Sequence, residues 1–253
     1  MLKMIVTDLD DTLLRSDKTI SDYTLKVLRE AQKKGIVVAF ATARSESVCN
    51  RFIGLVKPDA VISGSGAVIS FNNAVIYKCF MDKDTTNELL SLLLNHPGVG
   101  SITVDTDIGF FVNRPLDNPD SDYHGAKYTD FREGLPCGSY KITPEIFDDK
   151  TINEILAAFP TVGATKFSGE NWVRFADKTA NKFEGIKILA AHIGINLKDI
   201  AAFGDDYSDI EMIRGCGFGI AVSNAIKEVK AVSDHVCGSN DNDGAAKWLE
   251  GRI

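Results

Sequence analysis

The sequence has few cysteines, no long apolar run and no excess of basic residues. Its five cysteines lie far apart and form no C-x-x-C pair, so neither a zinc site nor a disulfide framework is expected. We interpret them as buried thiols of a cytoplasmic protein. The first residues turn acidic too early for a signal peptide, and no apolar run approaches the ~20 residues that a membrane span needs.

The charge excludes two classes of partner. The chain of 253 residues carries a net charge of −7, whereas non-specific binding to nucleic acid or to an anionic membrane needs a basic surface. The sequence shows no repeat and no low-complexity segment, and its length suits one large domain or two modest ones. It does not indicate an oligomeric state.

The two ends of the chain alternate apolar strands with helical patterns. Ser21 can cap a helix that Gly35 stops, and further helices are expected at 46–55 and 182–191. The apolar runs between them lack period-2 alternation, as in strands covered on both faces. This alternation predicts a parallel sheet with crossover helices, whose strands lie in KMIVTDLD, IVVAFATAR, DAVISGSGAVI, DIAAFGDD and GFGIAV.

The middle of the chain has a different pattern of apolar and polar residues. Its strand-like segments alternate apolar and polar residues, and helical patterns at 85–95 and 149–159 accompany them. We therefore predict an α/β fold with a Rossmann-like parallel-sheet core at 1–80 and 178–253, interrupted by an inserted α+β cap at 81–177.

Carboxylates gather where two of the core strands end. Asp8 and Asp10 follow the first strand, and Asp205 and Asp209 follow a later one. Sites in open parallel sheets form beyond the carboxyl ends of the strands, so these groups are expected to converge on one pocket. They would repel one another there without a cation, and their hard oxygen ligands suit Mg²⁺.

Other polar residues have two possible readings. Thr42, at the end of the second strand, can bind phosphate or cap a helix together with Ser45, and Arg44 can contact substrate or form a surface ion pair. Lys182 would balance the charge of the carboxylates. The GSGAV segment lacks the full G-x-G-x-x-G pattern, so it predicts a tight turn rather than a dinucleotide site.

Five motifs in order resemble a known family. They are similar to those of the Cof-like subfamily of phosphatases in the haloacid dehalogenase superfamily, in which a large α+β cap lies between the second and third motifs. The resemblance covers the core by its motifs and the cap by position and length. The segments that carry it are DLDDT, ATAR, NKFEGIKILAAHIGI, FGDDYSDIEMI with GIAVSNA, and NDNDGAAKWL.

The resemblance implies a role for each matching residue. Asp8 would be the nucleophile that forms an aspartyl-phosphate, and Asp10 would protonate the leaving oxygen and later activate water. Mg²⁺ would be held by Asp8, the carbonyl of Asp10 and Asp205, with Asp209 in support. The residues implied in phosphate binding are Thr42, Ala43, Lys182, Ser208 and Asn224.

Three positions depart from the family pattern. Ala43 stands where the family usually has glycine, and it keeps the backbone amide that meets phosphate. Ser65 and Ser208 stand where the family has asparagine, and the shorter serine side chain would reach phosphate through water. These changes bear on efficiency and substrate choice, and they leave the nucleophile, the acid/base group and the metal ligands in place.

The resemblance implies a Mg²⁺-dependent phosphatase acting on small phosphorylated metabolites, with sugar phosphates the expected class. A phosphomutase on sugar phosphates would use the same residues. A non-catalytic sugar-phosphate-binding regulator is the third possibility, although it would not need a nucleophile with its own acid. In the cap, Tyr123 and His124 either contact substrate or belong to a polar surface loop.

Overall fold

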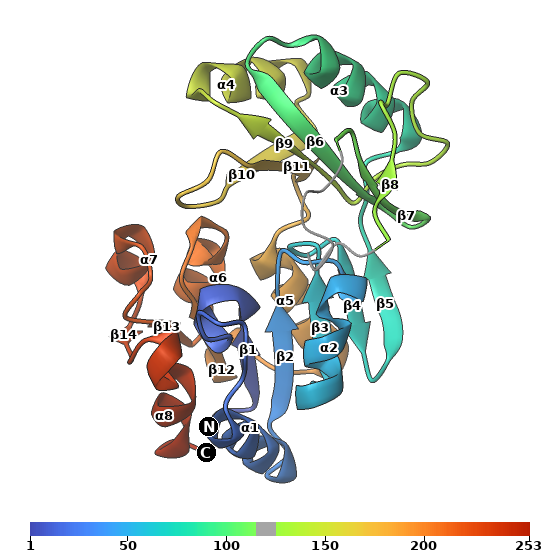
Figure 1. Ribbon diagram of the computed structural model, residues 1–253. Helices are drawn as coiled ribbons and strands as arrows, with labels where there is room; N and C mark the ends of the chain where they lie inside the picture. The colour runs from blue at the N-terminus through green and yellow to red at the C-terminus, as the bar shows by residue number, and fades with distance from the viewer. Residues whose placement is uncertain (115–124) are drawn as a thin grey trace. The chain divides into compact units, whose positions relative to one another are not determined.

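The computed structural model describes residues 1–114 and 125–253. Tyr123 and His124, the two cap residues considered for substrate contact, lie outside the described residues. The chain divides into two compact units, a core of residues 1–78 and 181–253 and an inserted unit of residues 79–180 (Figure 1). The boundaries predicted at 80 and 178 fall two and three residues from these positions.

The core contains a sheet of eight strands in the order β14-β13-β12-β1-β2-β3-β4-β5. Six strands run parallel, and β4 and β5 add an antiparallel edge. The parallel strands are β1 (Met4–Thr7), β2 (Val37–Ala41), β3 (Ala60–Ser63), β12 (Ile200–Gly204), β13 (Phe218–Ala221) and β14 (His235–Val236); the others are β4 (Val68–Phe71) and β5 (Ala74–Lys78).

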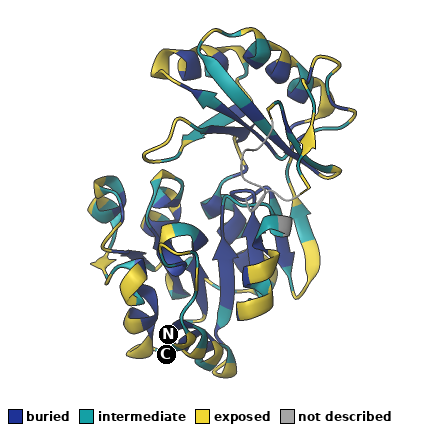
Figure 2. Ribbon diagram, viewed as in Figure 1, coloured by how far each residue is buried: buried dark blue, intermediate teal, exposed yellow. Residues whose placement is uncertain are grey.

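Helices cover both faces of this sheet, which explains why its strands are apolar throughout. Ile5 of β1 packs in one cluster with α1 (Asp22–Lys33), α2 (Glu46–Val56) and α8 (Gly244–Glu250). Met4 and Val6 point to the other face, toward α5 (Lys182–Ile193), α6 (Ile210–Gly215) and α7 (Lys227–Val232). Figure 2 shows the central strands as buried and the outer sides of several helices as exposed. The predicted parallel-sheet core is confirmed.

Two local predictions rest on single residues. The Ser21 hydroxyl accepts a hydrogen bond from the Thr24 amide and caps α1, and Gly35 follows the helix at φ +80°. The turn between β3 and β4 takes three residues with positive φ, of which Gly66 also passes so close to Asn181 that a Cβ would overlap its carbonyl oxygen. The GSGAV segment is therefore a tight turn, as predicted.

The inserted unit is an α+β structure with its own core. Its six-stranded sheet has the order β10-β11-β9-β6-β7-β8, and α3 (Lys83–Asn95) and α4 (Asp149–Ala158) pack on one face through a single apolar cluster (Figure 1). The strands are β6 (Val99–Thr106), β7 (Gly109–Val112), β8 (Lys127–Tyr128), β9 (Lys141–Ile146), β10 (Val162–Lys166) and β11 (Val173–Asp177).

The opposite face of this sheet is polar. Asp105 of β6 lies directly across from Lys141 of β9, with 3.8 Å between the carboxylate and the ammonium. Arg174 of β11 is buried and donates to the carbonyl of Ala180 at 2.8 Å. Because buried charges cost free energy unless they are paired, these contacts offset the cost of burying the three side chains within the unit.

The cysteine prediction holds in part. All five cysteines are free, in agreement with the absence of a disulfide framework. Only Cys49 and Cys216 are buried, so the expectation of buried thiols is wrong for the other three, which are half-buried: Cys79, Cys137 and Cys237. Within the described residues, the structure has no helix whose length and apolar character would let it cross a membrane.

Candidate active site

The site forms at the carboxyl edge of the core sheet. β1 lies between β12 and β2, with Thr7 in register with Phe203 and Phe40. Asp8 directly follows β1, and Asp205 directly follows β12. The parallel register therefore brings these two side chains together, as the sequence predicts.

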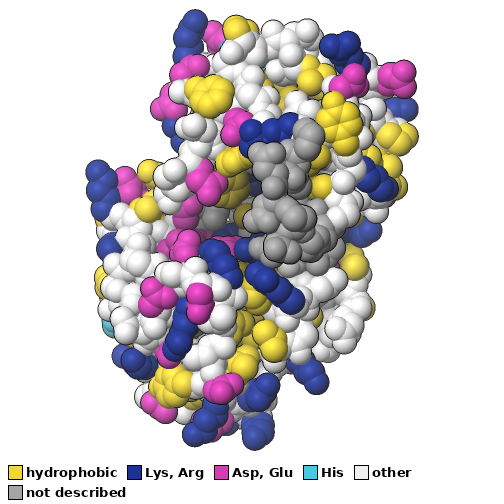
Figure 3. All heavy atoms as spheres, in the orientation of Figure 1, with side chains coloured by type: hydrophobic (Ala, Val, Ile, Leu, Met, Phe, Trp, Pro, Cys, Tyr) yellow, Lys and Arg dark blue, Asp and Glu magenta, His cyan; other side chains and the backbone are white. Residues whose placement is uncertain are grey.

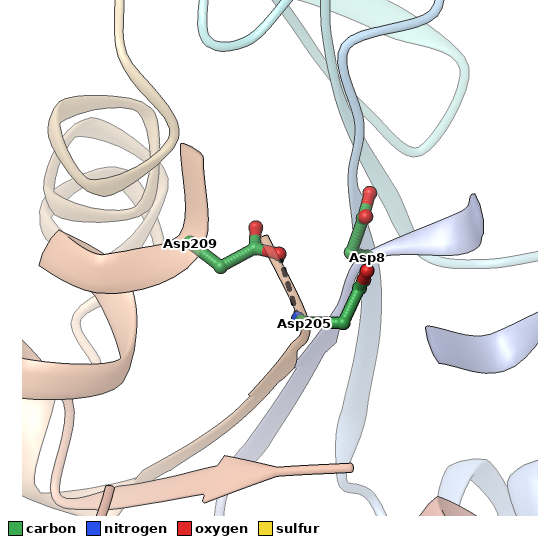
Figure 4. Close-up of side chains that lie close together, drawn as sticks. All are labelled: Asp8, Asp205 and Asp209. Atoms are coloured by element: carbon green, nitrogen blue, oxygen red, sulfur yellow. Dashed lines mark hydrogen bonds between the residues drawn. The ribbon is translucent and has the colours of Figure 1, made fainter. Parts of the chain in front are cut away.

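Asp209 joins Asp8 and Asp205 from the short helix η3 (Tyr207–Asp209). One carboxylate oxygen from each residue lies within 4.8 Å of the others (Figure 4). Asp8 is 7% exposed and Asp209 is fully buried. Gly204 makes the close approach possible, because a Cβ there would overlap the side chain of Asp209.

Lys182 supplies the positive charge of this cluster. Its Nζ lies 2.9 Å from Asp8 Oδ1 and 2.6 Å from Asp209 Oδ1. Asn181 caps α5 by accepting from the Glu184 amide, which fixes the first turn that carries Lys182. Burial lowers the pKa of Lys182, but the carboxylates of Asp209 and Asp8 outweigh this effect and raise it above its ordinary value. Lys182 therefore remains an ammonium group.

Asp209 is held at both of its oxygens. Oδ1 accepts from Lys182, and Oδ2 accepts from the backbone amides of Asp205 and Asp206 at 2.9 and 3.1 Å. Figure 4 shows the bond to the Asp205 amide. These contacts fit the supporting role implied for Asp209, since the residue fixes both the lysine and the loop that presents Asp205.

The chemistry of Asp8 and Asp205 fits a divalent cation. Burial raises the pKa of Asp8 to about 7, against the opposing effect of Lys182, and Asp209 and Asp10 raise it further. Burial, followed by the charges of Asp8 and Asp209, raises the pKa of Asp205 to about 9. Two buried oxygen donors that repel each other in this way are stabilised as carboxylates when a hard cation lies between them.

Asp10 has a different environment. It follows Leu9 in η1 (Leu9–Leu13) with extended backbone angles, and both of its oxygens bind the guanidinium of Arg44. Lys18 adds a bond of 3.1 Å. Burial raises the pKa of Asp10, but the bonds and charge of Arg44, followed by Lys18, outweigh it and hold the pKa below its ordinary value.

The residues implied in phosphate binding occupy the same edge of the core. The Thr42 hydroxyl accepts from the Arg44 amide at 3.1 Å, so it caps this turn while its own hydrogen is not used in that bond. Ala43 lies between them and Ser208 lies in η3, both half-buried. A phosphate contact of these three residues and of Lys182 stays a prediction.

Asn224 braces the loop that carries the first carboxylates. Its Nδ2 donates to the carbonyl of Asp11 at 2.6 Å, and its Oδ1 accepts from the Asn240 amide at 3.0 Å. This hydrogen bond helps to stabilise the backbone of Asp11, whose φ is +54°, a conformation that few residues with side chains favour. The structure thus gives Asn224 a positional role, and its predicted contact with phosphate is untested.

Sequence reasoning did not assign a role to Thr12 or Lys18. Thr12 is buried, and its hydroxyl donates to Asp205 Oδ1 at 2.6 Å. The sequence could have identified Thr12 as a residue of the site, since it is the threonine of the DLDDT signature. Lys18 carries no comparable signal, because it reaches Asp10 from a turn that no motif marks.

Comparison with known proteins identifies the family. A family model described as haloacid dehalogenase-like hydrolase matches residues 5–249. The chain is 27% identical, over 252 residues, to the 5-amino-6-(5-phospho-D-ribitylamino)uracil phosphatase YcsE of Bacillus subtilis, with 98% of this chain and 94% of that protein covered. It is 27% identical, over 263 residues, to the HMP-PP phosphatase of Enterobacter sp. (strain 638), with 98% and 95% covered.

A solved structure described as a subclass IIB sugar phosphatase of the same superfamily superposes with a TM-score of 0.87, at 25% identity and with 98% of both chains covered. The family model and these relatives identify a phosphatase with a Rossmann-like core and an inserted cap. The chain belongs to the haloacid dehalogenase-like hydrolases, and the resemblance drawn from its motifs is confirmed.

Proposed function

We propose that this protein is a Mg²⁺-dependent phosphatase that hydrolyses small phosphorylated metabolites, sugar phosphates among them, through an aspartyl-phosphate at Asp8. The observation that carries the proposal is the contrast between two neighbouring carboxylates. Asp8 is buried against Lys182, whereas Asp10 is bound by Arg44 and Lys18. Lys182 favours the carboxylate form of Asp8, which is the form that attacks phosphorus. Asp10 has a side chain that is 34% exposed, so it can exchange a proton with solvent and substrate. The two groups are therefore suited to the separate roles of nucleophile and acid/base group.

The metal would be held by chain oxygens at the carboxyl edge of the sheet. Asp8, Asp205 and the carbonyl of Asp10 are the proposed ligands, and the three carboxylates grouped around Asp8 support this choice. Bound there, Mg²⁺ would neutralise charge on the carboxylates and on the phosphoryl oxygens. Thr12 would orient Asp205 through its 2.6 Å bond, as outer-shell partners of metal ligands do.

The chain's own residues account for both halves of the reaction. Asp10 is a carboxylate in the free site, and the negative charge of the bound ester would bring a proton onto it. In the first half, an oxygen of Asp8 bonds to phosphorus, the ester P–O bond breaks, and Asp10 gives this proton to the departing oxygen, which leaves as an alcohol. In the second, water bonds to phosphorus and gives a proton to Asp10, while the bond between phosphorus and Asp8 breaks. Phosphate leaves, and both carboxyl groups return to their starting state.

Lys182 and Thr42 would bind the transferring phosphoryl oxygens, together with the amide of Ala43. Lys182 is 2% exposed. Because two carboxylates already fix its ammonium group, contact with phosphate costs little further conformational entropy. In this class of reaction, positioning and charge stabilisation make up most of the catalysis.

The substrate class rests on the relatives and on the inserted unit. The relatives include phosphatases named for a ribityl phosphate and for HMP-PP, and a sugar phosphatase. We propose that the inserted unit selects the substrate. Asp105, Lys141 and Arg174 are buried and paired within this unit, so they would shape the polar face of its sheet rather than bind the ligand themselves. Free thiols throughout the chain favour a cytoplasmic location.

Phosphate release from a panel of phosphorylated metabolites tests this function. Wild type and Asp8→Asn are compared with Mg²⁺ and with a chelator. We expect release that the chelator abolishes and that the variant lacks, and the ranking of the panel gives the substrate class. Residual activity of Asp8→Asn above about a tenth would contradict the assignment, since a lost nucleophile costs several orders of magnitude.

Release from no ester would instead favour a phosphomutase or a phosphate-binding regulator. Phosphorylation of Asp8 separates these two alternatives, because a mutase forms an aspartyl-phosphate and a regulator does not.

A further inference from the structure

The carboxylate of Asp10 is bound by cations from two separate loops. Arg44, which follows β2, donates from Nε to Oδ2 at 2.6 Å and from Nη2 to Oδ1 at 2.8 Å. Lys18, in the loop before α1, donates to Oδ1 at 3.1 Å. Figure 3 shows acidic and basic side chains side by side on the visible face of the core. The arginine forms a two-point contact, whereas the lysine forms a single one.

Arg44 is itself firmly placed. Its amide donates to Thr42 Oγ1 at 3.1 Å, and its carbonyl accepts from the Gly64 amide at 2.8 Å. Its guanidinium lies over the ring of Phe52, 5.6 Å from the centroid, and its side chain is 14% exposed. A side chain fixed at both ends can hold a partner in one orientation at little further entropic cost.

Lys18 is the weaker of the two partners. Its side chain is 39% exposed, and it belongs to a turn in which its φ is +60°. Two hydrogen bonds stabilise this turn, one from Arg15 to Asp243 and one from Ser16 to Asp241. The ammonium thus reaches Asp10 from a stable loop, but a single bond leaves the plane of the carboxylate free to rotate.

We infer that Arg44 is a positioning residue for Asp10, which fixes the plane of this carboxyl group so that it can deliver its proton to the leaving oxygen. The inference rests on the proposed function. A fork of two parallel N–H···O bonds sets both the direction and the rotation of a carboxylate. Lys18 donates to Oδ1 outside the fork, so the second lone pair of Oδ2 is the position at which Asp10 can carry the proton.

The test compares two substrates that differ in their need for an acid. An aryl phosphate has a leaving group that departs readily as an anion, whereas an alkyl phosphate needs its oxygen protonated. The parameter is kcat/KM, because it reports the steps up to formation of the aspartyl-phosphate. General acid catalysis contributes about 100-fold or more, so Arg44→Gln should lower kcat/KM for the alkyl ester by about 100-fold more than for the aryl ester.

Two variants complete the test. Arg44→Lys keeps a charge and most of the packing on Phe52 but cannot form the fork, so its loss should also be larger for the alkyl ester. Arg51→Gln removes the other guanidinium that lies on the Phe52 ring, 4.4 Å from its centroid, and it serves as the matched control. We expect it to change both esters by the same small factor.

The outcomes separate this inference from the proposed function. Equal losses on the two esters would overturn the inference, since Arg44 would then act on phosphate binding or on folding. Unchanged or increased activity of both Arg44 variants would also overturn it. The alkyl ester is taken from the panel of metabolites. If wild type hydrolysed no ester of that panel and no aryl phosphate while retaining its fold by circular dichroism, the proposed function would itself be refuted.

Discussion

Each carboxylate of the site has a distinct set of partners. Asp8 binds the buried ammonium of Lys182, and Asp10 binds the guanidinium of Arg44. Asp205 accepts from Thr12, and Asp209 accepts from two backbone amides in addition to Lys182. Four groups of one chemical type thus have different charged and polar partners, which the proposed two-step transfer of a proton and a phosphoryl group requires.

Asp209→Asn tests the supporting role of this residue. An amide nitrogen cannot accept, so the variant loses either the Lys182 contact or the two backbone contacts. We expect the free energy of unfolding to fall by about 3 kcal/mol, the scale of a broken buried ion pair. We expect kcat/KM to fall by about 100-fold through misplacement of Lys182. Urea titration and steady-state kinetics measure the two effects, and a stable, fully active variant would contradict the role.

Asp205→Asn tests the metal site without relying on turnover. Saturation at about 100 times Kd stabilises a protein by ~2.7 kcal/mol, so Mg²⁺ should raise the thermal midpoint of wild type and raise that of the variant much less. Without Mg²⁺ the variant should be at least as stable as wild type, because burial, followed by the charges of Asp8 and Asp209, disfavours the charged form of Asp205. NaCl at equal ionic strength is the control. Equal Mg²⁺ shifts in both proteins would exclude Asp205 as a ligand.

Sequence predicted where the candidate residues lie better than it predicted which side chains they contact. Asp8, Asp205 and Thr42 could be placed because each ends a buried parallel strand, and the register of such strands brings their ends together. The contacts of Arg44 and Lys18 with Asp10 could not be placed. These contacts form between long side chains on separate loops, and the pattern of apolar and polar residues along the sequence does not predict such contacts.

At the level of elements, Asp243 joins the start of α1 to the segment before α8. Its Oδ1 accepts from Ser21 and Thr24, and its Oδ2 accepts from Arg15. Asp243→Asn keeps the volume and tolerates the φ of +55°, but it loses one set of these bonds. We expect the free energy of unfolding to fall by about 2 kcal/mol at neutral pH, the scale of hydrogen bonds to a charged group.

This loss should depend on pH in a defined direction. Burial raises the pKa of Asp243, but its bonds to Ser21, Arg15 and Thr24 outweigh burial and lower it. A lowered pKa in the folded state stabilises the protein above the unfolded value of about 3.9, and this stabilisation disappears as the pH falls through the folded value. The difference between wild type and variant should therefore shrink in acid.

Denaturation at several pH values measures this dependence. Asp241→Asn, at an exposed carboxylate whose pKa the Ser16 bonds also lower, is the comparison and should show a smaller change in the same direction. A difference that is constant from pH 7 down into the acid range would contradict the charge-based explanation.

Long, strongly patterned elements were predicted well, whereas short ones were missed. The helix expected at 46–55 is α2 (Glu46–Val56), and the one expected at 182–191 is α5 (Lys182–Ile193). The sequence did not predict several short elements, among them β5, α7, β8, β10 and β14. Strands of two residues, and a strand such as VGATK with glycine and alanine, show little pattern of their own. They form because neighbouring strands offer hydrogen-bonding edges.

For the whole molecule, the chain consists of two compact units with different sheets, one parallel in its centre and the other largely antiparallel. The change from continuous apolar runs to polar alternation along the sequence predicted this division. Sequence did not predict the polar pairing within the inserted sheet, because Asp105 and Lys141 are far apart in the chain and meet only through strand register.

The state of the five thiols is a property of the whole molecule that can be measured directly. Because all five are free, titration of the denatured protein with a thiol reagent should give five thiols without prior reduction, and a reductant should leave the thermal midpoint unchanged. In the native protein, Cys49 and Cys216 should react slowest because they are buried. A count of three or one would reveal a disulfide and contradict this structure.

The most direct test of the central claim is a search for a phosphoryl group on Asp8. The enzyme is mixed with an ester that it hydrolyses, quenched in acid within one turnover, and digested for mass spectrometry. We expect the peptide that contains Asp8 to gain the mass of one phosphoryl group in wild type and not in Asp8→Asn. Full turnover by wild type with no phosphorylated Asp8 at any quench time, together with hydrolysis by Asp8→Asn, would contradict the claim.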